Sequence, residues 1–236
     1  MAELTVASFN VHWGVDMKGR RFDVVGAALA LAADVLVLQE IWRPYGEEAP
    51  VEKIARAMDA SLHETTFMSD SNPARPIHLV VPEGAPGTAG LAVLSRLPVL
   101  SADPVELPRP RGDVVDRRHA LVLTVQVDDR TVAIGGVHAS HRLWGSLPQL
   151  RLVDRVLRET GHPSVLTGDC NMWWPPIHAA LPGRRRAVIG RTWPQRRPHS
   201  QIDHILVDDG IEVIEGTVGQ PTGSDHRPVR ARLRVR

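Results

Sequence analysis

Polar side chains that can bind a cation or transfer a proton lie at the ends of short apolar runs along this sequence. Strand ends at one edge of a β-sheet can converge, so such residues can share a cleft although they lie far apart in the chain. Four carboxylates brought together in this way are costly without compensation. Oxygen ligands favour Mg²⁺ or Mn²⁺ over zinc, so the pattern indicates a site for a hard divalent cation. The residues concerned are Asn10, Glu40, His138, Asp169, Asn171, Asp203, Asp225 and His226.

The segments that carry these residues occur in a distinctive order. They are ASFNVHWG, VLVLQEIW, GLAVLSRLPV, GGVHASH, VLTGDCN, SQIDHILV and GSDHRPV. With these motifs the sequence resembles the endonuclease/exonuclease/phosphatase superfamily, which includes pancreatic-type deoxyribonucleases, bacterial AP endonucleases, neutral sphingomyelinases and inositol-polyphosphate 5-phosphatases. The resemblance runs from about Thr5 to Leu233. GDxN, IDH and SDHxPV are each weak signals alone, but together and in this order they are specific.

The resemblance implies a fold and a reaction. The fold is of the α/β (α+β) class: a four-layer α/β/β/α sandwich of two packed mixed sheets flanked by helices, forming one domain over residues 1–236. The active site lies at one edge of the packed sheets. The reaction is Mg²⁺-dependent hydrolysis of a phosphoester, with Mn²⁺ as an alternative cation. A positioned water attacks phosphorus in line, without a covalent enzyme intermediate.

By resemblance, three residues belong to the metal site. Asn10 supports the cation and the scissile phosphate through its amide, Glu40 is the principal metal-binding carboxylate, and Asp225 is a second carboxylate beside it. Each also has a simpler interpretation, because an Asn after a strand usually begins a turn and an isolated carboxylate is usually solvated. The shared motif order favours the metal site.

By the same resemblance, five residues take part in catalysis. His138 hydrogen-bonds the phosphoryl oxygens, and Asn171 stabilises the transition state. Asp169 orients or deprotonates the attacking water. Asp203 orients the imidazole of His226, which is a base or a transition-state contact. A neutral imidazole accepts a proton near neutral pH, so the sequence leaves open whether Asp169 or His226 is the general base.

Cys170 lies between two of these residues but is expected to be a buried thiol. Alternation along a strand turns it away from Asp169 and Asn171, and free cysteines often behave as small hydrophobes. His204, next to Asp203, is expected on the opposite face of its strand, below the site.

Short β-rich runs that end in polar residues alternate with helical patterns, which favours a layered α/β domain. Proline-rich stretches at Pro104–Pro110 and Pro175–Pro198 are interpreted as surface loops. The predicted helices are Phe22–Ala33, Val51–Met58 and Ser146–Thr160. The predicted strands are Leu4–Phe9, Val35–Leu38, Ile77–Val81, Leu91–Leu94, Ala120–Val127, Thr131–Val137, Ser164–Thr167, Gln201–Val207, Glu212–Val218 and Val229–Val235.

The overall composition excludes several classes of protein. The 236 residues include 28 Lys and Arg against 27 Asp and Glu, so no global basic field points to nucleic acid or an anionic membrane. A hydrophobic fraction of 43% is typical of a globular chain. One cysteine excludes an internal disulfide and a zinc site of several thiolates. Neither a secretory signal nor a membrane span is visible, so a cytoplasmic protein is expected, by default a monomer.

Tryptophans near the motifs are the main indication of the substrate. Trp173 and Trp174 follow Asn171, Trp193 precedes the IDH strand, and Trp13 lies in the first motif. Indoles can stack on bases, and arginines neutralise a nucleic-acid backbone. The alternative is that these tryptophans pack the loops and that the arginines are solvated. The arginines interleaved with these tryptophans are Arg184, Arg185, Arg186, Arg191, Arg196 and Arg197.

Three functions are therefore compatible with the sequence. The first is a nuclease that cleaves DNA or RNA. The second is a phosphatase or phosphodiesterase that acts on an inositol phosphate, a nucleotide or a phospholipid head group. The third is a non-catalytic binding module on the same fold, which is disfavoured because every expected catalytic position carries a suitable residue.

Overall fold

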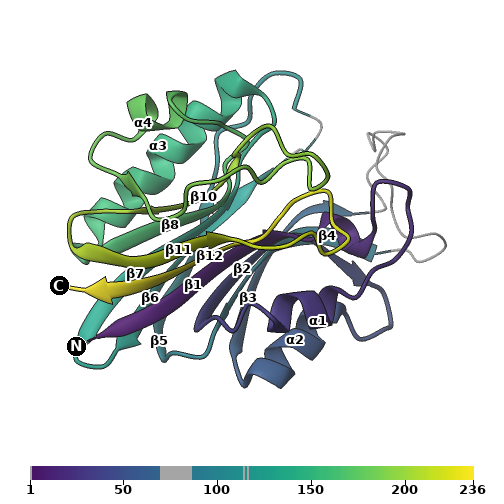
Figure 1. Ribbon diagram of the computed structural model, residues 1–236, viewed down its shortest axis with the longest axis horizontal. Coiled ribbons are helices and arrows are strands. Elements are labelled where there is room, and N and C mark those ends of the chain that lie inside the picture. The colour runs from purple at the N-terminus through teal and green to yellow at the C-terminus, as the bar shows by residue number, and fades with distance from the viewer. Residues whose placement is uncertain (1, 70–86, 114, 116) are drawn as a thin grey trace.

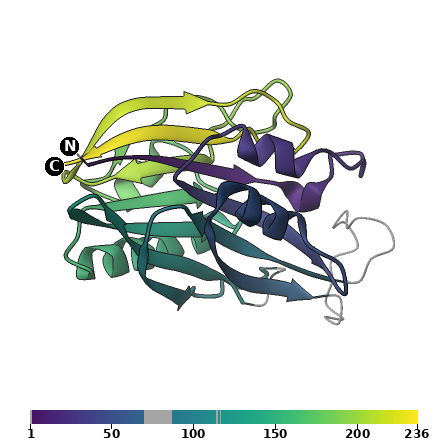
Figure 2. The ribbon, with the colours of Figure 1, turned by 90° about the horizontal axis from the view of Figure 1, so that it is seen from below.

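The computed structural model describes residues 2–69, 87–113, 115 and 117–236. In this part of the chain two six-stranded mixed sheets pack face to face, and helices cover their outer faces (Figures 1 and 2). The predicted four-layer sandwich is confirmed. The predicted strand Ile77–Val81 lies outside the described residues.

The first sheet has the strand order β11-β12-β1-β2-β4-β3, and the second has the order β5-β6-β7-β8-β10-β9. One parallel pair lies inside each sheet, β1 with β2 and β7 with β8. The strands are β1 Glu3–Asn10, β2 Val35–Pro44, β3 Ser61–Ser69, β4 Gly87–Ser95, β5 Val99–Glu106, β6 His119–Val127, β7 Arg130–His138, β8 Ser164–Asp169, β9 Arg185–Arg186, β10 Asp203–Val207, β11 Ile211–Val218 and β12 Val229–Val235.

The helices are short except for one. They are the 3-10 helix η1 His12–Gly14 and the α-helices α1 Val24–Leu29, α2 Pro50–Met58, α3 Leu143–Glu159 and α4 Pro176–Ala180. Helices α1 and α2 lie on the first sheet, and α3 and α4 lie on the second (Figure 1). Within the described residues, no helix is long and apolar enough to span a membrane.

The main core lies between the sheets and is made of alternating aliphatic residues of both, including Val37, Val93 and Ile134. Gly136 on β7 permits their close approach, because a Cβ there would lie 2.8 Å from Val93 and 3.0 Å from Val37. Burial of these aliphatic side chains contributes about 25 cal/mol per Å² of apolar surface. The stacked sheets form the rigid platform that holds the strand ends in place.

Most predicted elements are present, and the differences occur where chain context overrides local pattern. The predicted helix Phe22–Ala33 is shorter, Val24–Leu29. Asp23 caps its start by accepting a hydrogen bond from Gly26 N at 2.8 Å, and the left-handed backbone of Ala32, at φ 45°, breaks the helical conformation before Ala33.

Two regions that were predicted as loops contain regular structure. Pro104 lies in β5, an exposed strand at the edge of the second sheet, where proline is tolerated. The stretch Pro175–Pro198 contains α4 and β9. The edge strand β3, Ser61–Ser69, was not predicted from its mixed polar sequence, SLHETTFMS.

Candidate active site

Strand register brings the polar residues together at one edge of each sheet. In the second sheet His138 lies opposite Asp169, and Asp169 lies opposite Asp203, so the ends of β7, β8 and β10 meet. In the first sheet Asn10 lies opposite Gln39, which precedes Glu40. Parallel strands end at the same edge, so the parallel pairs position residues from distant segments side by side.

Local backbone irregularities aim two of these side chains. The register of β2 against β4 shifts between Gln39 and Ile41, and Glu40 at this bulge has φ 56°. A bulge re-aims one side chain relative to the pleat. Asn171 has φ 47°. Left-handed conformations at non-glycine residues are uncommon and cluster at functional sites.

Gly168 explains why the GDxN motif needs a glycine before its aspartate. Its φ is 144°, and a Cβ at this position would overlap the carbonyl oxygen of Val137. Only glycine accommodates this approach between β8 and β7, which sets Asp169 beside His138.

Asn10 links the two sheets through its side chain. Its Nδ2 donates to Glu40 Oε1 and to Asp169 Oδ2, both at 3.1 Å, and its Oδ1 accepts a hydrogen bond from His12 N at 3.0 Å. The residue is 1% exposed. The amide therefore holds two carboxylates from different sheets at a defined separation.

His226 lies between the carboxylates of Asp203 and Asp169. Its Nδ1 lies 2.9 Å from Asp203 Oδ2 and its Nε2 lies 3.7 Å from Asp169 Oδ2. A carboxylate only accepts hydrogen bonds, so Nδ1 is the donor. Ser224 anchors the segment, because its Oγ donates to Asn10 O at 2.6 Å and accepts from His226 N at 3.1 Å.

His138 faces the carboxylates of Glu40 and Asp169. Its Nε2 lies 3.7 Å from Glu40 Oε1 and from Asp169 Oδ2, and the edge-on ring of Phe67 lies 5.6 Å away. Its Nδ1 is buried and has no hydrogen-bond partner among the described residues. One ring nitrogen of His138 is therefore left unsatisfied by the described residues, at a position that solvent does not reach.

The electrostatics of the cluster reflect burial of several acids together. Burial, reinforced by the charge of Asp225, raises the pKa of Glu40. Burial also raises the pKa of Asp169, to about 7. Burial acts to lower the pKa of His226, but the charges of Asp203 and Asp169 dominate and raise it well above its usual value.

The donor set fits a hard divalent cation. Glu40 Oε2 is buried and has no hydrogen-bond partner within the described ranges, and the nearby Asp225 carboxylate adds further oxygen ligands. Ligand atoms of Asp169, Asp203 and His226 also lie within 4.8 Å of one another. Because Asp203 and His226 already satisfy each other through a hydrogen bond, we regard the oxygen-rich side around Glu40 as the better cation site.

The cluster opens into a cavity of about 470 Å³. Trp13, Trp173 and Trp193 line it together with Glu40 and Asp169, as expected from the sequence. Trp193 Nε1 also donates to Asp225 Oδ2 at 3.2 Å. Aromatic faces and the acidic cluster therefore share one cleft.

Arg118 is a cleft residue that the sequence did not reveal. It lines the cavity, is 6% exposed and forms an ion pair with the buried Asp113 at 3.3 Å. Its guanidinium lies 5.8 Å from the centre of the Phe67 ring, and Nη1 donates to His138 O at 3.4 Å. The surrounding DVVDRRHA has no motif, and only burial and the partner Asp113 distinguish Arg118 from a solvated arginine.

Several expected substrate contacts lie elsewhere. Trp174 and Arg191 do not line the cavity. Trp174 stacks on Arg186, whose guanidinium carbon lies 4.1 Å from the ring centre. Arg184 is buried and pairs with Asp154 at 2.7 Å, so it is neither the backbone-neutralising arginine that was predicted nor the solvated arginine of the alternative.

The residues next to Asp169 and Asp203 follow the expectation from strand alternation. Cys170 is buried in the core beneath α3 and α4, and burial raises the pKa of its thiol well above the usual value. His204 is fully buried, and its Nε2 lies 2.9 Å from Met172 O. The predicted buried thiol is confirmed.

Comparisons with known proteins agree with this geometry. The profile of the Endonuclease/Exonuclease/phosphatase family matches residues 7–226. No curated protein matches the sequence. Among solved structures, an endonuclease/exonuclease/phosphatase from Beutenbergia cavernae is similar with a TM-score of 0.76 and 23% identity, over 100% of this chain and 72% of that chain.

Two further similar structures are those of named proteins. A mannosyl-6-phosphatase from Bacteroides thetaiotaomicron has a TM-score of 0.75 and 18% identity, over 98% of this chain and 99% of that chain. A truncated TDP2 from Caenorhabditis elegans has a TM-score of 0.69 and 15% identity, over 98% of this chain and 97% of that chain. At these identities the likeness concerns the fold.

Proposed function

The chain belongs to the Endonuclease/Exonuclease/phosphatase family and is a metal-dependent phosphoester hydrolase, and from this premise we propose that it is a Mg²⁺-dependent nuclease that cleaves phosphodiesters of DNA or RNA. The observation that carries the proposal is the sharing of one cavity by the acidic cluster and by Trp13, Trp173 and Trp193. Base stacking on aromatic side chains is worth about 1–3 kcal/mol per base and tolerates any sequence.

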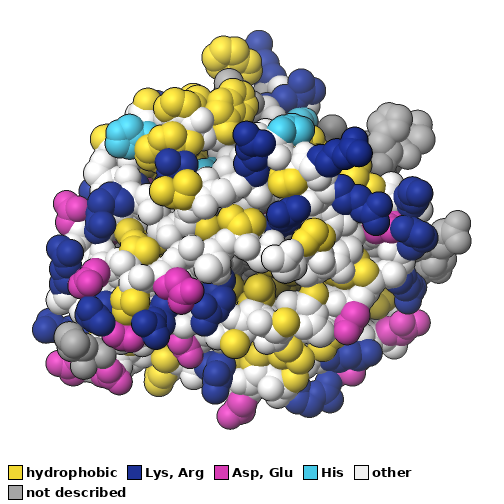
Figure 3. Space-filling model, viewed as in Figure 1, with side chains coloured by type: hydrophobic (Ala, Val, Ile, Leu, Met, Phe, Trp, Pro, Cys, Tyr) yellow, Lys and Arg dark blue, Asp and Glu magenta, His cyan; other side chains and the backbone are white. Residues whose placement is uncertain are grey.

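Positive charge near the site also supports a polyanionic substrate. Arg118 supplies a buried guanidinium in the cleft wall, and Arg196 and Arg197 are exposed in the loop that follows Trp193. In Figure 3 Lys and Arg side chains lie at the right of the molecule, the side toward which β1 runs from the N-terminus in Figure 1, and others lie among acids at the left. Such charge neutralises phosphates along a strand.

In the proposed reaction Glu40, Asp225 and Asn10 hold the cation. When bound, the cation neutralises charge on the phosphate oxygens and on the leaving oxygen. Asp203 fixes the imidazole of His226 with its Nε2 toward the cleft, where Asp169 also lies. One of these two groups, Asp169 or His226, accepts the proton of the attacking water.

The remaining residues act on the phosphoryl group. Asn171 is held by its backbone N, which donates to Asp169 Oδ1 at 2.9 Å, and by its Nδ2, which donates to Ala139 O at 3.0 Å. Its second amide hydrogen and the imidazole of His138 donate to phosphoryl oxygens. Donors held in place before the reaction stabilise developing charge at no cost of reorganisation.

A small phosphoester is the second candidate substrate. The cavity of about 470 Å³ falls within the range of about 300–1,000 Å³ typical of sites that enclose small molecules. Phe67 and Val115 add apolar walls on the side of His138. A nucleotide or a sugar phosphate fits such a cleft. A nucleic-acid substrate differs from a small phosphoester in that its strand extends beyond the cleft.

The deciding experiment is a hydrolysis screen. Single-stranded DNA, plasmid DNA, RNA and a panel of small phosphoesters are incubated with Mg²⁺, with Mn²⁺ and with EDTA, and Asp169→Asn protein serves as the control for contaminating nucleases. Cleavage of nucleic acid that requires the cation and does not occur with the variant supports the proposal. Turnover of small esters alone favours the second candidate, and no turnover at all favours a binding module.

A further inference from the structure

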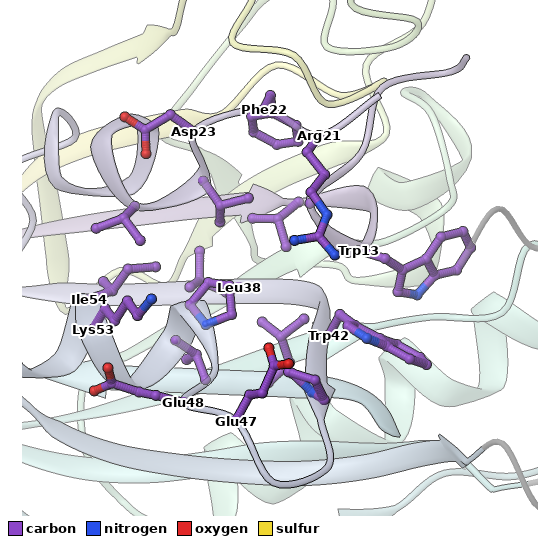
Figure 4. A pocket seen from close by; sticks show the side chains of 18 residues that line it. Trp13, Arg21, Phe22, Asp23, Leu38, Trp42, Glu47, Glu48, Lys53 and Ile54 are labelled. Atoms are coloured by element: carbon purple, nitrogen blue, oxygen red, sulfur yellow. The ribbon is translucent and has the colours of Figure 1, made fainter. Parts of the chain in front are cut away.

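A second cavity of about 260 Å³ lies between η1 and α1 on one side and the end of β2 and α2 on the other. Figure 4 shows its side chains. Its floor is apolar and includes Leu38, Ile41 and Ile54. Trp13 lines both this cavity and the catalytic cleft, so the two spaces are neighbours that share an indole wall.

Three charged groups of this cavity have no ion-pair partner among the described residues. Arg21 and Lys53 extend toward the middle of the cavity from opposite walls, and Glu47 extends from below (Figure 4).

The other two acids of the cavity are already occupied. Glu48 pairs with Arg56, and Asp23 caps α1 through Gly26 N. The unpaired charges are therefore two cations and one carboxylate above an apolar floor. This arrangement matches a ligand that has an anionic group and an apolar part with polar atoms along its edge.

Two buried indole groups in the cavity wall are incompletely satisfied. Nε1 of Trp13 and Nε1 of Trp42 have no hydrogen-bond partner within the described part of the chain, and the two residues are 8% and 9% exposed. A buried donor without an acceptor costs about 1–3 kcal/mol. Both nitrogens are inaccessible to solvent, so they are unsatisfied donors inside the cavity wall that a ligand reaches only if the indoles turn.

We propose that this second cavity binds one unstacked nucleotide of the nucleic-acid substrate while another phosphate lies in the catalytic cleft; this inference rests on the proposed nuclease function. At ~30 Å³ per water-sized group, the cavity of about 260 Å³ holds about one nucleobase. The base enters the apolar floor between Phe22 and Trp42. Arg21 and Lys53 contact the adjoining phosphate.

Glu47 gives the proposed cavity a preference among bases. A carboxylate accepts a hydrogen bond from an exocyclic amine, which cytosine carries and thymine lacks. The substrate favoured at this position is therefore a single-stranded segment, or a frayed end, with an amine-bearing base. A stacked duplex does not present a base to the cavity without unpairing.

The test compares Arg21→Ala/Lys53→Ala with the control Lys18→Ala/Arg155→Ala, which removes the same charge from exposed residues outside the cavity. Each protein is titrated in EDTA with a fluorescent single-stranded oligonucleotide at several salt concentrations. It is then assayed with Mg²⁺ on the same oligonucleotide and on bis(p-nitrophenyl) phosphate, a diester too short to span both cavities.

Arg21→Ala/Lys53→Ala is expected to bind the oligonucleotide about tenfold more weakly than wild type. The slope of log binding constant against log salt concentration is expected to be smaller by about 0.7 for each phosphate that the variant no longer neutralises. Its ratio of kcat/KM on the oligonucleotide to kcat/KM on bis(p-nitrophenyl) phosphate is expected to fall about tenfold as well. The control is expected to match wild type. Glu47→Ala is expected to abolish the preference for oligo(dC) over oligo(dT).

Two results overturn the inference, and they differ from each other. If wild type cleaves the oligonucleotide but Arg21→Ala/Lys53→Ala behaves like the control, the second cavity does not bind the strand and the nuclease function stands. If wild type hydrolyses bis(p-nitrophenyl) phosphate but neither binds nor cleaves the oligonucleotide, the nuclease function fails and the inference fails with it.

Discussion

Nδ1 of His226 donates a hydrogen bond to Asp203 Oδ2 at 2.9 Å, although 23 residues separate them in the sequence. This contact sets the tautomer and leaves Nε2 facing Asp169 at 3.7 Å. Both residues are almost fully buried, at 5% and 1% exposure, so the imidazole has little freedom to rotate. A substitution of Asp203 is therefore expected to change which nitrogen of His226 carries the proton.

Asp203→Asn is expected to lower kcat by roughly 10²–10⁴-fold, the usual range for loss of acid–base catalysis. An asparagine amide that donates to Nδ1 forces the proton onto Nε2, and the imidazole then has no lone pair toward the cleft. Steady-state kinetics on any substrate from the hydrolysis screen measures the effect. The side chain of Asp209 is 93% exposed, so Asp209→Asn is the matched control. A folded Asp203→Asn protein with the kcat of wild type contradicts the role.

Glu40→Gln is expected to remove the stabilisation of the protein by Mg²⁺. A ligand that binds only the folded state raises Tm with its concentration, and Glu40 is the proposed principal ligand. In EDTA the variant is expected to be at least as stable as wild type, because burial and the charge of Asp225 raise the pKa of Glu40 and thus oppose its ionised form.

Thermal melts with increasing MgCl₂ measure this effect of Glu40. Glu215→Gln, an exposed carboxylate on β11, is the control and is expected to keep the Mg²⁺ response of wild type. An unchanged Mg²⁺ response in Glu40→Gln protein places the cation elsewhere.

Arg118→Ala is expected to destabilise the fold by about 3–5 kcal/mol, because it leaves the buried Asp113 without its partner. The double variant Asp113→Ala/Arg118→Ala is expected to recover much of this loss, since no uncompensated charge remains. Denaturant unfolding measures both. If the single and double variants are equally unstable, the ion pair is not the cause.

The double variant also separates structure from substrate binding. Hydrogen bonds to charged groups are worth about 1.5–3 kcal/mol, so its KM for a phosphodiester is expected to rise at least about tenfold although its stability recovers. A KM equal to that of wild type limits Arg118 to a structural role.

Arg184→Met is expected to cost about 1.5–3 kcal/mol of stability, because Asp154 loses its hydrogen bond to the buried Arg184 but keeps its ion pair with Arg158 at 2.9 Å. The guanidinium also donates to Ser164 O at 2.8 Å and to Ser164 Oγ at 3.0 Å. Urea unfolding measures the change, with the exposed Arg155→Met as control. Below its melting temperature the Arg184→Met protein is expected to have the kcat/KM of wild type. A rise in KM without a change in kcat contradicts the structural role of Arg184.

The strand ends and their polar residues were predictable from the sequence. Leu4–Phe9 and Ser164–Thr167 are short apolar runs that stop at Asn10 and before Asp169, and the structure has strands there. Alternation along the chain also predicted the burial of Cys170. These features depend on local pattern, because side chains of a strand point alternately to its two faces.

Contacts between the sheets depended on tertiary structure. Asn10 Nδ2 reaches Asp169 Oδ2 across 159 residues, and no local pattern encodes that distance. The same applies to the arginines, whose roles differ although their sequence contexts look alike: Arg184 is a buried structural partner, Arg118 lines the cleft, and Arg191 lies at the exposed surface.

The sequence by itself therefore determined which residue types stand at the strand ends and the chemistry available to them. Only the tertiary structure decided which side chains share the cleft, that Trp13 separates it from a second cavity, and that Trp174 packs against Arg186 instead. The physical reason is that the environment of a long polar or aromatic side chain is set by the packing of sheets and loops around it, whereas strand formation follows from the alternation of neighbouring residues.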